Sequence, residues 1–488
     1  MTNSLASIRD ALRSAGLLVG ERGTLPDTVS GVTDDSRAVA AGALFLAVRG
    51  AERDGHDFLA AAAERGATAA VVDDPSRTSL PALIVSDTRR AAAVAAAAYY
   101  DEPARSLRLI GVTGTNGKTT TVGMLRHLLD EVDARTASIG TLGVLIGGEG
   151  EPLDGGSGLT TPGPVELQRV LRALHDRGVR TIAMETSSHA LHQRRVEGLA
   201  FEAAVFTNLT RDHLDYHGTM EAYFEAKALL VEYLAPNGVA VINADDPAWE
   251  SLPHTKRAVR FGTTRAADAH ATDVRCTPEG SRFTLVFDGA PHEVALPMIG
   301  DFNVANALAA AACAWALGVA PATIVARLGT MPQVPGRLEI LHGRPTVLRD
   351  YAHTPDALER AIAAVRPFTP GRLVVVFGCG GDRDRGKRPE MGRIAVDRAD
   401  LAIATSDNPR TEDPGRILDD IEAGMHGAAH ERIEDRHAAI ARAIALAGPN
   451  DLVLLAGKGH ETYQVRGTTR LPFDERAIVR EIIQERQS

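Results

Sequence analysis

LIGVTGTNGKTT, at residues 109–120 of this 488-residue chain, leads from an apolar strand-like run through a glycine loop into a helix-forming stretch. Glycines allow successive backbone N–H groups to turn toward a phosphate, the Lys118 ammonium can reach its oxygens, and the Thr119 hydroxyl can ligate Mg²⁺. The strict phosphate-loop pattern would need a glycine at position 112, where this chain has Val112, so the loop is a shortened variant. The pattern predicts that a nucleoside triphosphate is bound by Gly114, Thr115, Asn116, Gly117, Lys118, Thr119 and Thr120.

The chain on both sides of the loop alternates short apolar runs with helical stretches. Such alternation is typical of α/β domains built on mostly parallel sheets. The helix after the loop is expected at residues 119–132. Strands are expected at residues 42–48, 69–72, 82–85, 107–113, 181–184, 203–207, 238–243, 346–350, 372–377, 401–405 and 452–456.

Two breaks in this pattern divide the chain into three parts. The alternation restarts near Arg105, and the segment MPQVPGR at 331–337 has the prolines and the glycine of a linker. Between the breaks, residues 270–295 alternate around turn residues and predict hairpin strands in a small appended β-sheet. We therefore expect three α/β domains, the central one of phosphate-loop type with a mostly parallel sheet and the last one Rossmann-like, at residues 1–105, 106–335 and 336–488.

The composition argues against several classes of protein. Lys and Arg total 53 against 63 Asp and Glu, and the resulting formal charge of −10 disfavours a nucleic-acid binder. The cysteines Cys276, Cys313 and Cys379 are scattered and form no C-x-x-C pair, which disfavours a disulfide framework or a zinc cluster. The first residues build no continuous apolar segment, and no apolar stretch resembles a membrane-spanning helix. We expect a soluble cytoplasmic protein without membrane insertion.

Four motifs along the chain together resemble those of one enzyme family. Besides the phosphate loop, they are MetGluThrSerSerHis at 184–189, PheGluAlaLys at 224–227 and AspAsnProArg at 407–410. They resemble motifs of the Mur ligases, the amide-forming synthetases of bacterial cell-wall precursors, and the loop is also similar to that of the related folylpolyglutamate synthetases. Matching motifs extend from about residue 33 to residue 461, so the resemblance covers nearly the whole chain. It implies a uridine-binding first domain, an ATP-binding central domain and an amino-acid-binding last domain.

The resemblance implies that Lys118, His213 and Lys227 are catalytic and that Thr119, Glu185, His213 and Lys227 bind Mg²⁺. In the family, carbon dioxide converts the lysine of F-x-x-A-K to a carbamate, whose oxygens suit a hard divalent ion better than an ammonium does. The residues alone favour blander interpretations. On that basis, Lys227 would be a surface lysine and His213 a polar loop residue. Glu185 could equally well be a metal ligand or a charge at the end of a strand.

The remaining ATP contacts implied by the resemblance lie in three further segments. Asn303 and Asn306 would face adenine from one side of a helix, because they are three positions apart. Arg337 would pair with phosphate oxygens, and Asp350 would accept a hydrogen bond from a ribose hydroxyl. Without the resemblance, a helix cap, a linker charge and a strand-end charge would be the better explanations of these residues.

Two sets of residues resemble the family's other substrate contacts. Ser36, in ThrAspAspSerArg at 33–37, and the segment GlyAlaGluArgAspGlyHis at 50–56 are similar to the uridine-binding region, although a turn serine remains a competing explanation. The contacts to the UDP-MurNAc-dipeptide would then be Ser36, Thr160, Thr161, Ser187, Gln193 and Arg195. AspAsnProArg resembles the signature of family members that add diaminopimelate, whose distal end needs a fork for its carboxylate and an acceptor for its ammonium. The corresponding contacts would be Arg383, Asp407, Asn408, Pro409, Arg410, Gly457 and Glu461.

The implied reaction is an ATP-dependent amide ligation in peptidoglycan precursor synthesis. ATP would phosphorylate the D-glutamyl carboxylate of UDP-MurNAc-L-Ala-D-Glu, and the amine of meso-diaminopimelate would attack the acyl phosphate, with the enzyme acting as a monomer. The four residues AspAsnProArg do not distinguish meso-diaminopimelate from a stereoisomer or a related diamine. The base that receives the amine's proton could be His213, His353 or His460. The alternatives are a folylpolyglutamate-type ligase and a nucleotide-switched binding protein.

Overall fold

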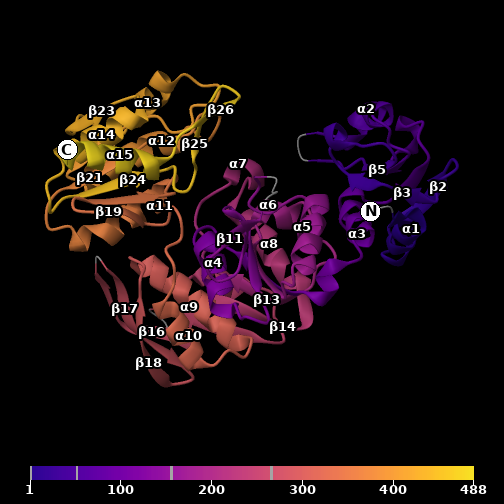
Figure 1. The fold of residues 1–488 in the computed structure, drawn as a ribbon, viewed down its shortest axis with the longest axis horizontal. Coiled ribbons are helices and arrows are strands. Elements are labelled where there is room, and N and C mark those ends of the chain that lie inside the picture. The colour runs from indigo at the N-terminus through magenta and orange to yellow at the C-terminus, as the bar shows by residue number, and fades with distance from the viewer. Residues whose placement is uncertain (1–2, 51–52, 154–157, 264–266, 278, 488) are drawn as a thin grey trace. The chain divides into compact units, whose positions relative to one another are not determined.

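The computed structural model describes residues 3–50, 53–153, 158–263, 267–277 and 279–487. Its chain forms two compact units, of which unit 1 comprises Met1–Ala269 and Ala309–Ala320, and unit 2 comprises His270–Leu308 and Pro321–Ser488. The described residues form a three-domain α/β architecture with mostly parallel sheets, which confirms the predicted fold class (Figure 1). The domain boundaries after residues 105 and 335 stay predictions.

The three inner strands of the first sheet of unit 1 are short and apolar, and almost all of their residues are buried. Its edge strand is antiparallel to its neighbour and the other strands are parallel. The strand order is β2 (Leu18–Arg22), β7 (Ala82–Val85), β6 (Ala69–Val72), β5 (Ala43–Leu46) and β4 (Gly31–Thr33). The helices of this region are α1 (Leu5–Ser14), α2 (Leu59–Glu64) and α3 (Thr88–Tyr99), and β1 (Asn3–Ser4) pairs with β3 (Thr28–Val29).

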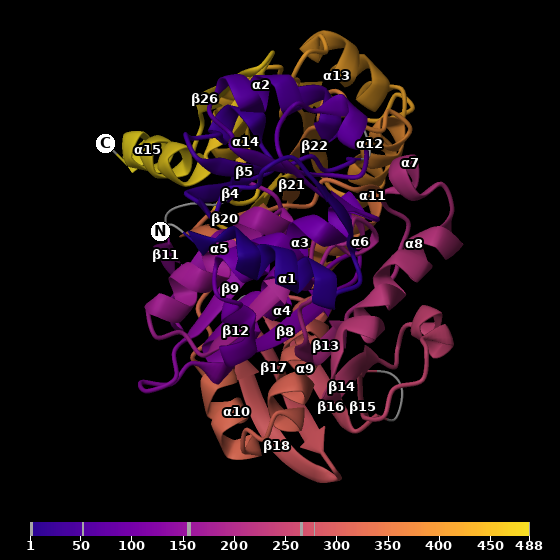
Figure 2. The same cartoon turned by 90° about the vertical axis from the view of Figure 1, so that its right-hand side faces the viewer.

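The second sheet of unit 1 carries the phosphate loop. Within unit 1, the order of this sheet is β11 (Glu151–Leu153), β10 (Gly143–Ile146), β9 (Thr136–Gly140), β12 (Thr181–Glu185), β8 (Arg108–Thr113), β13 (Phe201–Phe206), β14 (Leu234–Asn243) and β15 (Ala258–Gly262). The strands from β9 to β15 are parallel, and β10 and β11 add an antiparallel edge. The helices are α4 (Lys118–Leu129), which packs against β9 and β12 (Figure 2), α5 (Pro164–Asp176), α6 (Ser188–His192), α7 (Leu214–His217) and α8 (Met220–Ala228).

The register of this sheet brings three strand ends together. Glu185 at the end of β12 lies opposite Val112 of β8, and Phe206 at the end of β13 lies opposite Thr113. In parallel sheets, ligands bind outside the carboxyl ends of the strands. The phosphate loop after β8 therefore lies between the residues that follow β12 and those that follow β13.

Unit 2 contains a hairpin and a doubly covered sheet. The strands predicted at 270–295 are β16 (Ala269–Thr277), which begins at the last residue of a unit 1 segment, β17 (Gly280–Phe287) and β18 (Ala290–Leu296), of which β17 and β18 form the hairpin. They are followed by α9 (Asp301–Ala316), whose residues from Ala309 on belong to unit 1, and by α10 (Pro321–Gly329). The sheet order is β19 (Glu339–Gly343), β20 (Thr346–Asp350), β24 (Leu452–Ala456), β21 (Leu373–Phe377), β22 (Leu401–Ala404) and β23 (His430–Arg432), all parallel except β19. A short hairpin consists of β25 (Tyr463–Arg466) and β26 (Thr469–Pro472).

Alternate residues of β21 face opposite layers of helices in unit 2, as the strand period of two requires. Val375 and Phe377 belong to the core under α11 (Pro355–Val365), α12 (Lys387–Arg398) and α13 (Pro414–Glu422). Val374 and Val376 belong to the core under α14 (Arg436–Leu446) and α15 (Glu475–Gln487). Residues 331–337 form neither helix nor strand. Among the residues that the structure describes, no helix is both long enough and apolar enough to cross a membrane.

Candidate functional site

The phosphate loop requires two of its glycines. Gly114 has φ 145°, and a Cβ there would collide with Thr207 Oγ1; Gly117, at φ 84°, immediately precedes the first residue of α4. The loop therefore presents backbone N–H groups at a helix N-terminus, where anions bind. Lys118 lies across the loop, and its Nζ donates to the carbonyl oxygens of Gly114 at 2.9 Å and Thr115 at 2.7 Å.

The segment after β13 supports the loop from the other side. The Asn116 N–H donates to Asn208 Oδ1 at 2.9 Å, and Thr207 Oγ1 donates to the Asn116 carbonyl at 2.7 Å. The Thr115 N–H donates to the Asn208 carbonyl at 2.7 Å. The sequence patterns did not indicate a role for Asn208, although it lies in the same ThrAsnLeuThrArgAspHis stretch as His213.

Lys227 lies inside the protein, not on its surface. It is 1% exposed on α8, its Nζ donates to the Gly114 carbonyl at 2.7 Å, and it lies 4.4 Å from the centre of the Tyr223 ring. Burial lowers the pKa of Lys227 well below its usual value, and the positive charge of Lys118 lowers it further, whereas Asp212 opposes this. The two lysines thus donate to one carbonyl oxygen, and the sequence-only expectation of a surface lysine is wrong.

His213 lies beside these two lysines. It adopts φ 53° just before α7, a conformation uncommon for a residue other than glycine. Desolvation lowers its pKa, and the charges of Lys118 and Lys227 act in the same direction, while Asp212 acts against them. The His213 ring also meets the His189 ring edge-on at 4.8 Å.

Glu185 is a buried carboxylate whose hydrogen bonds come from Thr141. It is 1% exposed; the Thr141 N–H donates to its Oε1 at 2.8 Å and the Thr141 hydroxyl donates to its Oε2 at 3.2 Å. A Cβ on Gly140 would lie 2.8 Å from Glu185 Cδ, so the glycine makes room for the carboxylate. No basic side chain pairs with Glu185 within the described part of the chain. A buried charge without a partner is costly, and a bound cation would compensate it.

The predicted dipeptide contacts form a connected group next to Glu185. Thr161 Oγ1 donates to the Glu185 carbonyl at 2.8 Å and lies 3.3 Å from Ser187 Oγ. Arg195 donates to the Thr161 carbonyl at 2.9 Å and to Gln193 Oε1 at 2.8 Å. The Thr160 hydroxyl lies 3.3 Å from the Thr141 hydroxyl, which connects this group to the predicted magnesium ligand.

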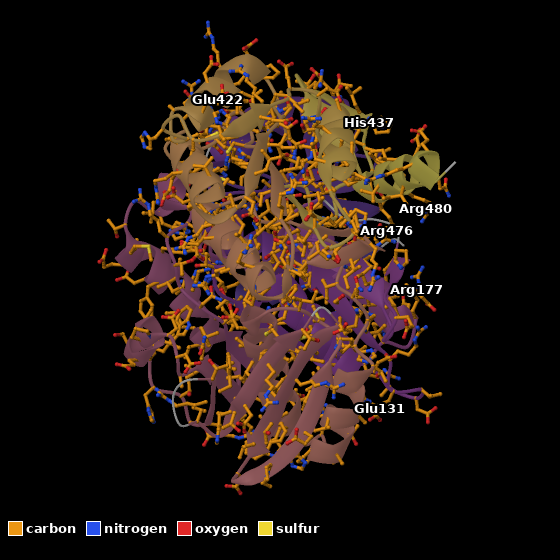
Figure 3. The ribbon with its side chains drawn as sticks, turned by 90° about the vertical axis from the view of Figure 1, so that its left-hand side faces the viewer. Glu131, Arg177, Glu422, His437, Arg476 and Arg480 are labelled. Carbon is orange, nitrogen blue, oxygen red and sulfur yellow. The ribbon has the colours of Figure 1, made fainter. Side chains whose placement is uncertain are left out.

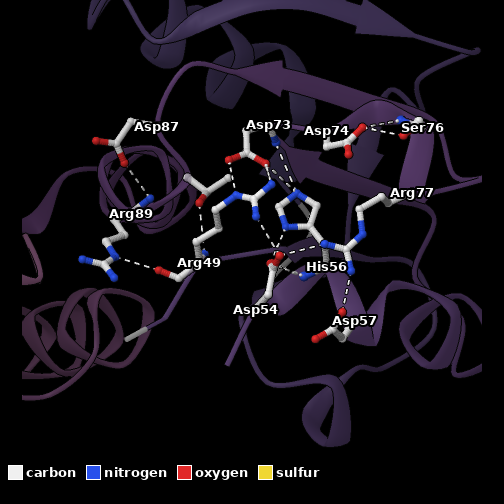
Figure 4. A network of polar contacts seen from close by, with 11 residues as sticks. Arg49, Asp54, His56, Asp57, Asp73, Asp74, Ser76, Arg77, Asp87 and Arg89 are labelled. Atoms are coloured by element: carbon white, nitrogen blue, oxygen red, sulfur yellow. Dashed lines mark hydrogen bonds and ion pairs between the residues drawn. The ribbon is translucent and has the colours of Figure 1, made fainter. Parts of the chain in front are cut away.

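Ser36 is separate from that group: it begins a short 3-10 helix, and in the described residues it makes no hydrogen bond to the other five predicted contacts. The predicted uridine segment ends in a network of ion pairs, which Figure 4 shows. His56 is buried, with Nδ1 2.7 Å from Asp54 and Nε2 3.0 Å from Asp73. Desolvation raises the pKa of Asp54, but hydrogen bonds from His56 and Arg77 outweigh it and lower the pKa to about 2.

The predicted ATP contacts of unit 2 fall into two pairs. Asn303 is fully buried and donates to the Ile299 carbonyl at 2.8 Å, and Asn306 donates to Asn303 Oδ1 at 3.3 Å. Asp350 accepts from the Leu338 and Ala352 N–H groups at 2.7 and 2.8 Å. Burial raises the pKa of Asp350, and the nearby charge of Arg337 opposes this shift.

Four of the predicted diaminopimelate contacts meet around a residue that the sequence patterns did not single out. Lys458 Nζ donates to Asn408 Oδ1 at 2.9 Å, to Glu461 Oε2 at 3.0 Å and to Asp407 Oδ1 at 3.4 Å. A Cβ on Gly457 would lie 2.6 Å from Asp407 Oδ2. Lys458 stands in the AlaGlyLysGlyHisGlu stretch at 456–461, and its position between two glycines was the only signal.

The remaining predicted diaminopimelate contacts, Arg383, Pro409 and Arg410, lie in or against the loop of residues 380–385. A Cβ on Gly380 would lie 2.8 Å from Arg410 Nη1 and 3.8 Å from Arg383 Cγ, which places both arginines at one glycine. Arg410 Nη1 donates to the Gly381 carbonyl at 2.7 Å, and Pro409 approaches Gly381 so closely that a Cβ there would collide with its carbonyl.

The buried Arg388 holds this loop through Glu412. Its two Nη atoms pair with the Glu412 carboxylate, which also accepts from the Asp382 N–H. These hydrogen bonds from Arg388 lower the pKa of Glu412 to about 2.

Two of the three candidate bases lie together in unit 2. The rings of His353 and His460 lie 4.7 and 5.5 Å from the ring of Tyr351.

A separate pocket of about 450 Å³ between β19 and α15 is lined by Arg476 and Arg480, whose side chains Figure 3 labels. It contains none of the predicted site residues, so it is distinct from the candidate site.

Comparison with known proteins gives one consistent family. Residues 28–105 match the model of the Mur ligase family catalytic domain, 112–314 that of the Mur ligase middle domain, and 336–459 that of the Mur ligase glutamate ligase domain. Among curated proteins, the UDP-N-acetylmuramoyl-L-alanyl-D-glutamate–2,6-diaminopimelate ligase of Geobacillus kaustophilus is 46% identical over 94% of this chain and 96% of its own. That of Synechococcus elongatus is 46% identical over 97% of each chain.

A solved structure of a UDP-N-acetylmuramoyl-L-alanyl-D-glutamate–2,6-diaminopimelate ligase is 34% identical to this chain, with a TM-score of 0.69 and complete coverage of both chains. The fold, the motifs and these matches agree from the first domain to the last. This chain belongs to the Mur ligase family.

Proposed function

We propose that the protein joins diaminopimelate to the D-glutamyl carboxylate of UDP-MurNAc-L-Ala-D-Glu at the expense of ATP, in peptidoglycan precursor synthesis. The observation that carries this proposal is the hydrogen-bonded group formed by the buried Asp407, Asn408 and Lys458 with Glu461, beside which Arg383 and Arg410 meet at Gly380. It offers acceptors for an ammonium and forks for a carboxylate, as the distal end of diaminopimelate needs. The names of the relatives agree with this assignment.

The reaction has two steps. An oxygen of the glutamyl carboxylate attacks the γ-phosphorus of ATP, so a new P–O bond forms while the bond to ADP breaks. The amine nitrogen then attacks the acyl carbon, phosphate leaves as the amide bond forms, and the amine loses a proton. Lys118 and the loop N–H groups stabilise the transferring phosphoryl group, while Thr161, Ser187 and Arg195 orient the dipeptide beside them.

The residues present fit a divalent cation. Glu185 is a buried carboxylate without a basic partner among the described residues, and Thr119 is the second residue of α4, directly after Lys118. We propose that Glu185, Thr119 and His213 hold Mg²⁺. When bound, Mg²⁺ would neutralise negative charge on the phosphoryl group being transferred.

Lys227 is proposed to contribute as a carbamate. Its depressed pKa favours the neutral amine, whose nitrogen lone pair can attack carbon dioxide; a C–N bond forms, one proton leaves, and the product is an anionic carbamate. The carbamate would place a negative charge next to the Lys118 ammonium, whereas a protonated Lys227 would be repelled by it. The carbamate would offer the anionic oxygens that Mg²⁺ prefers.

The substrate-binding residues are also proposed from the sequence motifs. Ser36, Thr160, Gln193, Arg195 and their neighbours are proposed to bind the UDP-linked dipeptide. Asn303, Asn306, Arg337 and Asp350 are proposed to bind ATP. We also propose that the three domains meet at residues 105 and 335. We further propose that the enzyme acts as a cytoplasmic monomer on these small molecules.

One assay tests the proposal against its alternatives. The ligase should release ADP only when UDP-MurNAc-L-Ala-D-Glu and diaminopimelate are both present. ADP release with a folate and glutamate instead would identify a folylpolyglutamate-type ligase. Slow hydrolysis that ignores both acceptors would identify a nucleotide-switched binding protein, and either result would overturn the proposed function.

A further inference from the structure

The Lys458 side chain is completely buried and surrounded by acceptors. It is 0% exposed, and its three ammonium hydrogens face three oxygens, on Asn408, Glu461 and Asp407, at 2.9, 3.0 and 3.4 Å. An ammonium has three donors and no acceptor, so these contacts use its whole hydrogen-bonding capacity. Lys458 therefore cannot touch a substrate, and any role it has is exerted through these three neighbours.

The contacts also decide which way the Asn408 amide faces. Its Oδ1 accepts from Lys458 Nζ and from the Val465 N–H, both at 2.9 Å, and its Nδ2 donates to Glu461 Oε2 at 2.8 Å. A flipped amide would set its NH₂ group against two donors. Lys458 and Val465 thus fix the orientation of Asn408, and Asn408 and Lys458 together fix the carboxylate of Glu461.

The backbone around Lys458 is held on both sides. Gly457 has φ 110° and its N–H donates to the Asp350 carbonyl at 3.0 Å. Gly459 has φ 53°, and a Cβ there would lie 2.6 Å from Tyr351 Cβ. A side chain at either position would push the segment away, so Lys458 has one place from which to reach its three acceptors.

Lys458 also sets the charge of the group. Asp407 and Glu461 carry two negative charges and Lys458 returns one, which leaves a single negative charge for a single ammonium of the substrate. The cations for a carboxylate are supplied separately by Arg383 and Arg410 at Gly380. One net negative charge and the two arginines match the ammonium and the carboxylate of a zwitterionic end group. Without Lys458, the two uncompensated carboxylates of Asp407 and Glu461 would favour a plain amine.

We propose that Lys458 is a positioning residue that makes the site selective for the zwitterionic distal end of diaminopimelate over the plain terminal amine of L-lysine. This inference rests on the proposed function. It assigns selectivity to a residue that does not contact the substrate, acting through Asn408 and Glu461.

The test compares Lys458→Met in the full-length chain with the unchanged enzyme. Removal of one partner of a buried charge group should raise the KM for diaminopimelate at least about 10-fold, with the KM for ATP changed less than about 2-fold. The ratio of kcat/KM for diaminopimelate to that for L-lysine should fall by about 10-fold or more, because the site gains negative charge and loses its fixed amide. Lys256→Met, at an exposed lysine of unit 1, is the matched control and should leave the ratio unchanged.

Lys458→Arg keeps the charge but replaces three converging donors by a planar fork, so its ratio should lie between those of the other two proteins. If Lys458→Met lowers kcat/KM for both amino acids equally, Lys458 is merely structural and the proposal is overturned. Should the methionine variant not fold, an arginine variant with the ratio of the unchanged enzyme overturns it as well. If the unchanged enzyme does not use diaminopimelate at all, the proposed function fails, and this inference with it; if it does and only the ratio is insensitive, this inference alone fails.

Discussion

Lys227 in unit 1 and Lys458 in unit 2 are both buried at the candidate sites, yet their surroundings are opposite. Lys227 has a backbone carbonyl, an aromatic ring and a second ammonium beside it. Lys458 has two carboxylates and an amide oxygen. A buried cation is tolerated when it is paired, so Lys458 belongs to a permanent framework. Lys227 has no carboxylate hydrogen-bonded to it among the described residues, and its lowered pKa fits the change of charge state that the proposed carbamate requires.

This difference extends to the regions around the two lysines. The unit 1 site contains unbalanced charges of both signs, because Lys118 and Lys227 share one acceptor while Glu185 has no basic partner within the described residues. The unit 2 site is balanced by Lys458 and by the pairing of Arg388 with Glu412. We infer that unit 1 is arranged to be completed by charged ligands, whereas unit 2 is arranged to recognise a substrate without rearrangement.

The largest effect should follow from removing the cation of the phosphate loop. Lys118→Ala should slow ADP release on the order of 10³-fold or more, because the charge that stabilises the transferring phosphoryl group is lost. The fold should be retained, since the hydrogen bonds from Lys118 Nζ to the Gly114 and Thr115 carbonyls stay within the loop itself. The measurement is ADP release at saturating substrates, with Lys256→Ala as the control. Near-normal release would show that Lys118 is not part of the reaction.

The second effect concerns the carbamate. Lys227→Ala should reduce amide formation by roughly 10²-fold or more, and Lys227→Arg should do no better, because a guanidinium is not carboxylated. Formate should partly restore the alanine variant by supplying a carboxylate in the vacated space, but not the arginine variant, whose side chain fills it. The measurement is activity at rising formate concentration, with ionic strength held constant by chloride. Full activity of the alanine variant without formate would contradict the carbamate.

The sequence predicted the strands well where apolar runs are bounded by turn residues. The strands at 69–72, 82–85, 346–350 and 452–456 have the predicted bounds. The helix predicted at 119–132 ends at Leu129, because the Asp130 carboxylate leaves the helix to accept from the N–H groups of Thr136 and Gly148. Such a tertiary contact has no signal in local periodicity.

The same limit applies to the site. Lys118, Glu185 and Lys227 could be proposed from the sequence because each stands in a recognisable motif. Thr141 and Asn208 were not, because they act by closeness in space: Thr141 follows β9 and reaches Glu185 at the end of the neighbouring strand β12. This contact can be recognised only once the register of β9 and β12 in the sheet is known.

A smaller effect is expected at Arg410, which should sharpen the description of unit 2 as a balanced site. Arg410→Lys keeps the charge but loses the fork, so a substrate carboxylate would lose about one charge-assisted hydrogen bond, at a cost of roughly 1.5 to 3 kcal/mol. The penalty should appear in the KM for diaminopimelate and leave that for ATP nearly unchanged. If instead only the KM for ATP rises, Arg410 belongs to the nucleotide site.

The smallest effect is on stability, and it should have opposite signs at the two lysines. The folded-state pKa of Lys227 lies well below the usual 10.5, so the unfolded chain binds more protons at intermediate pH. Its burial therefore costs most stability at low pH, and this cost disappears as the pH rises toward 10.5. Lys227→Met should raise the Tm by about 2 °C or more near neutral pH, with the gain shrinking toward about pH 10.

Lys458→Met should lower the Tm near neutral pH, because it leaves Asp407 and Glu461 without their cation. Both variants are measured without ligands in buffer purged of carbon dioxide, since a carbamate on Lys227 would remove the repulsion that the substitution is meant to relieve. Added bicarbonate should then stabilise the unchanged protein but not Lys227→Met. A fall in Tm for both variants at every pH would show that Lys227 is as well compensated as Lys458, and the contrast between the two units would be lost.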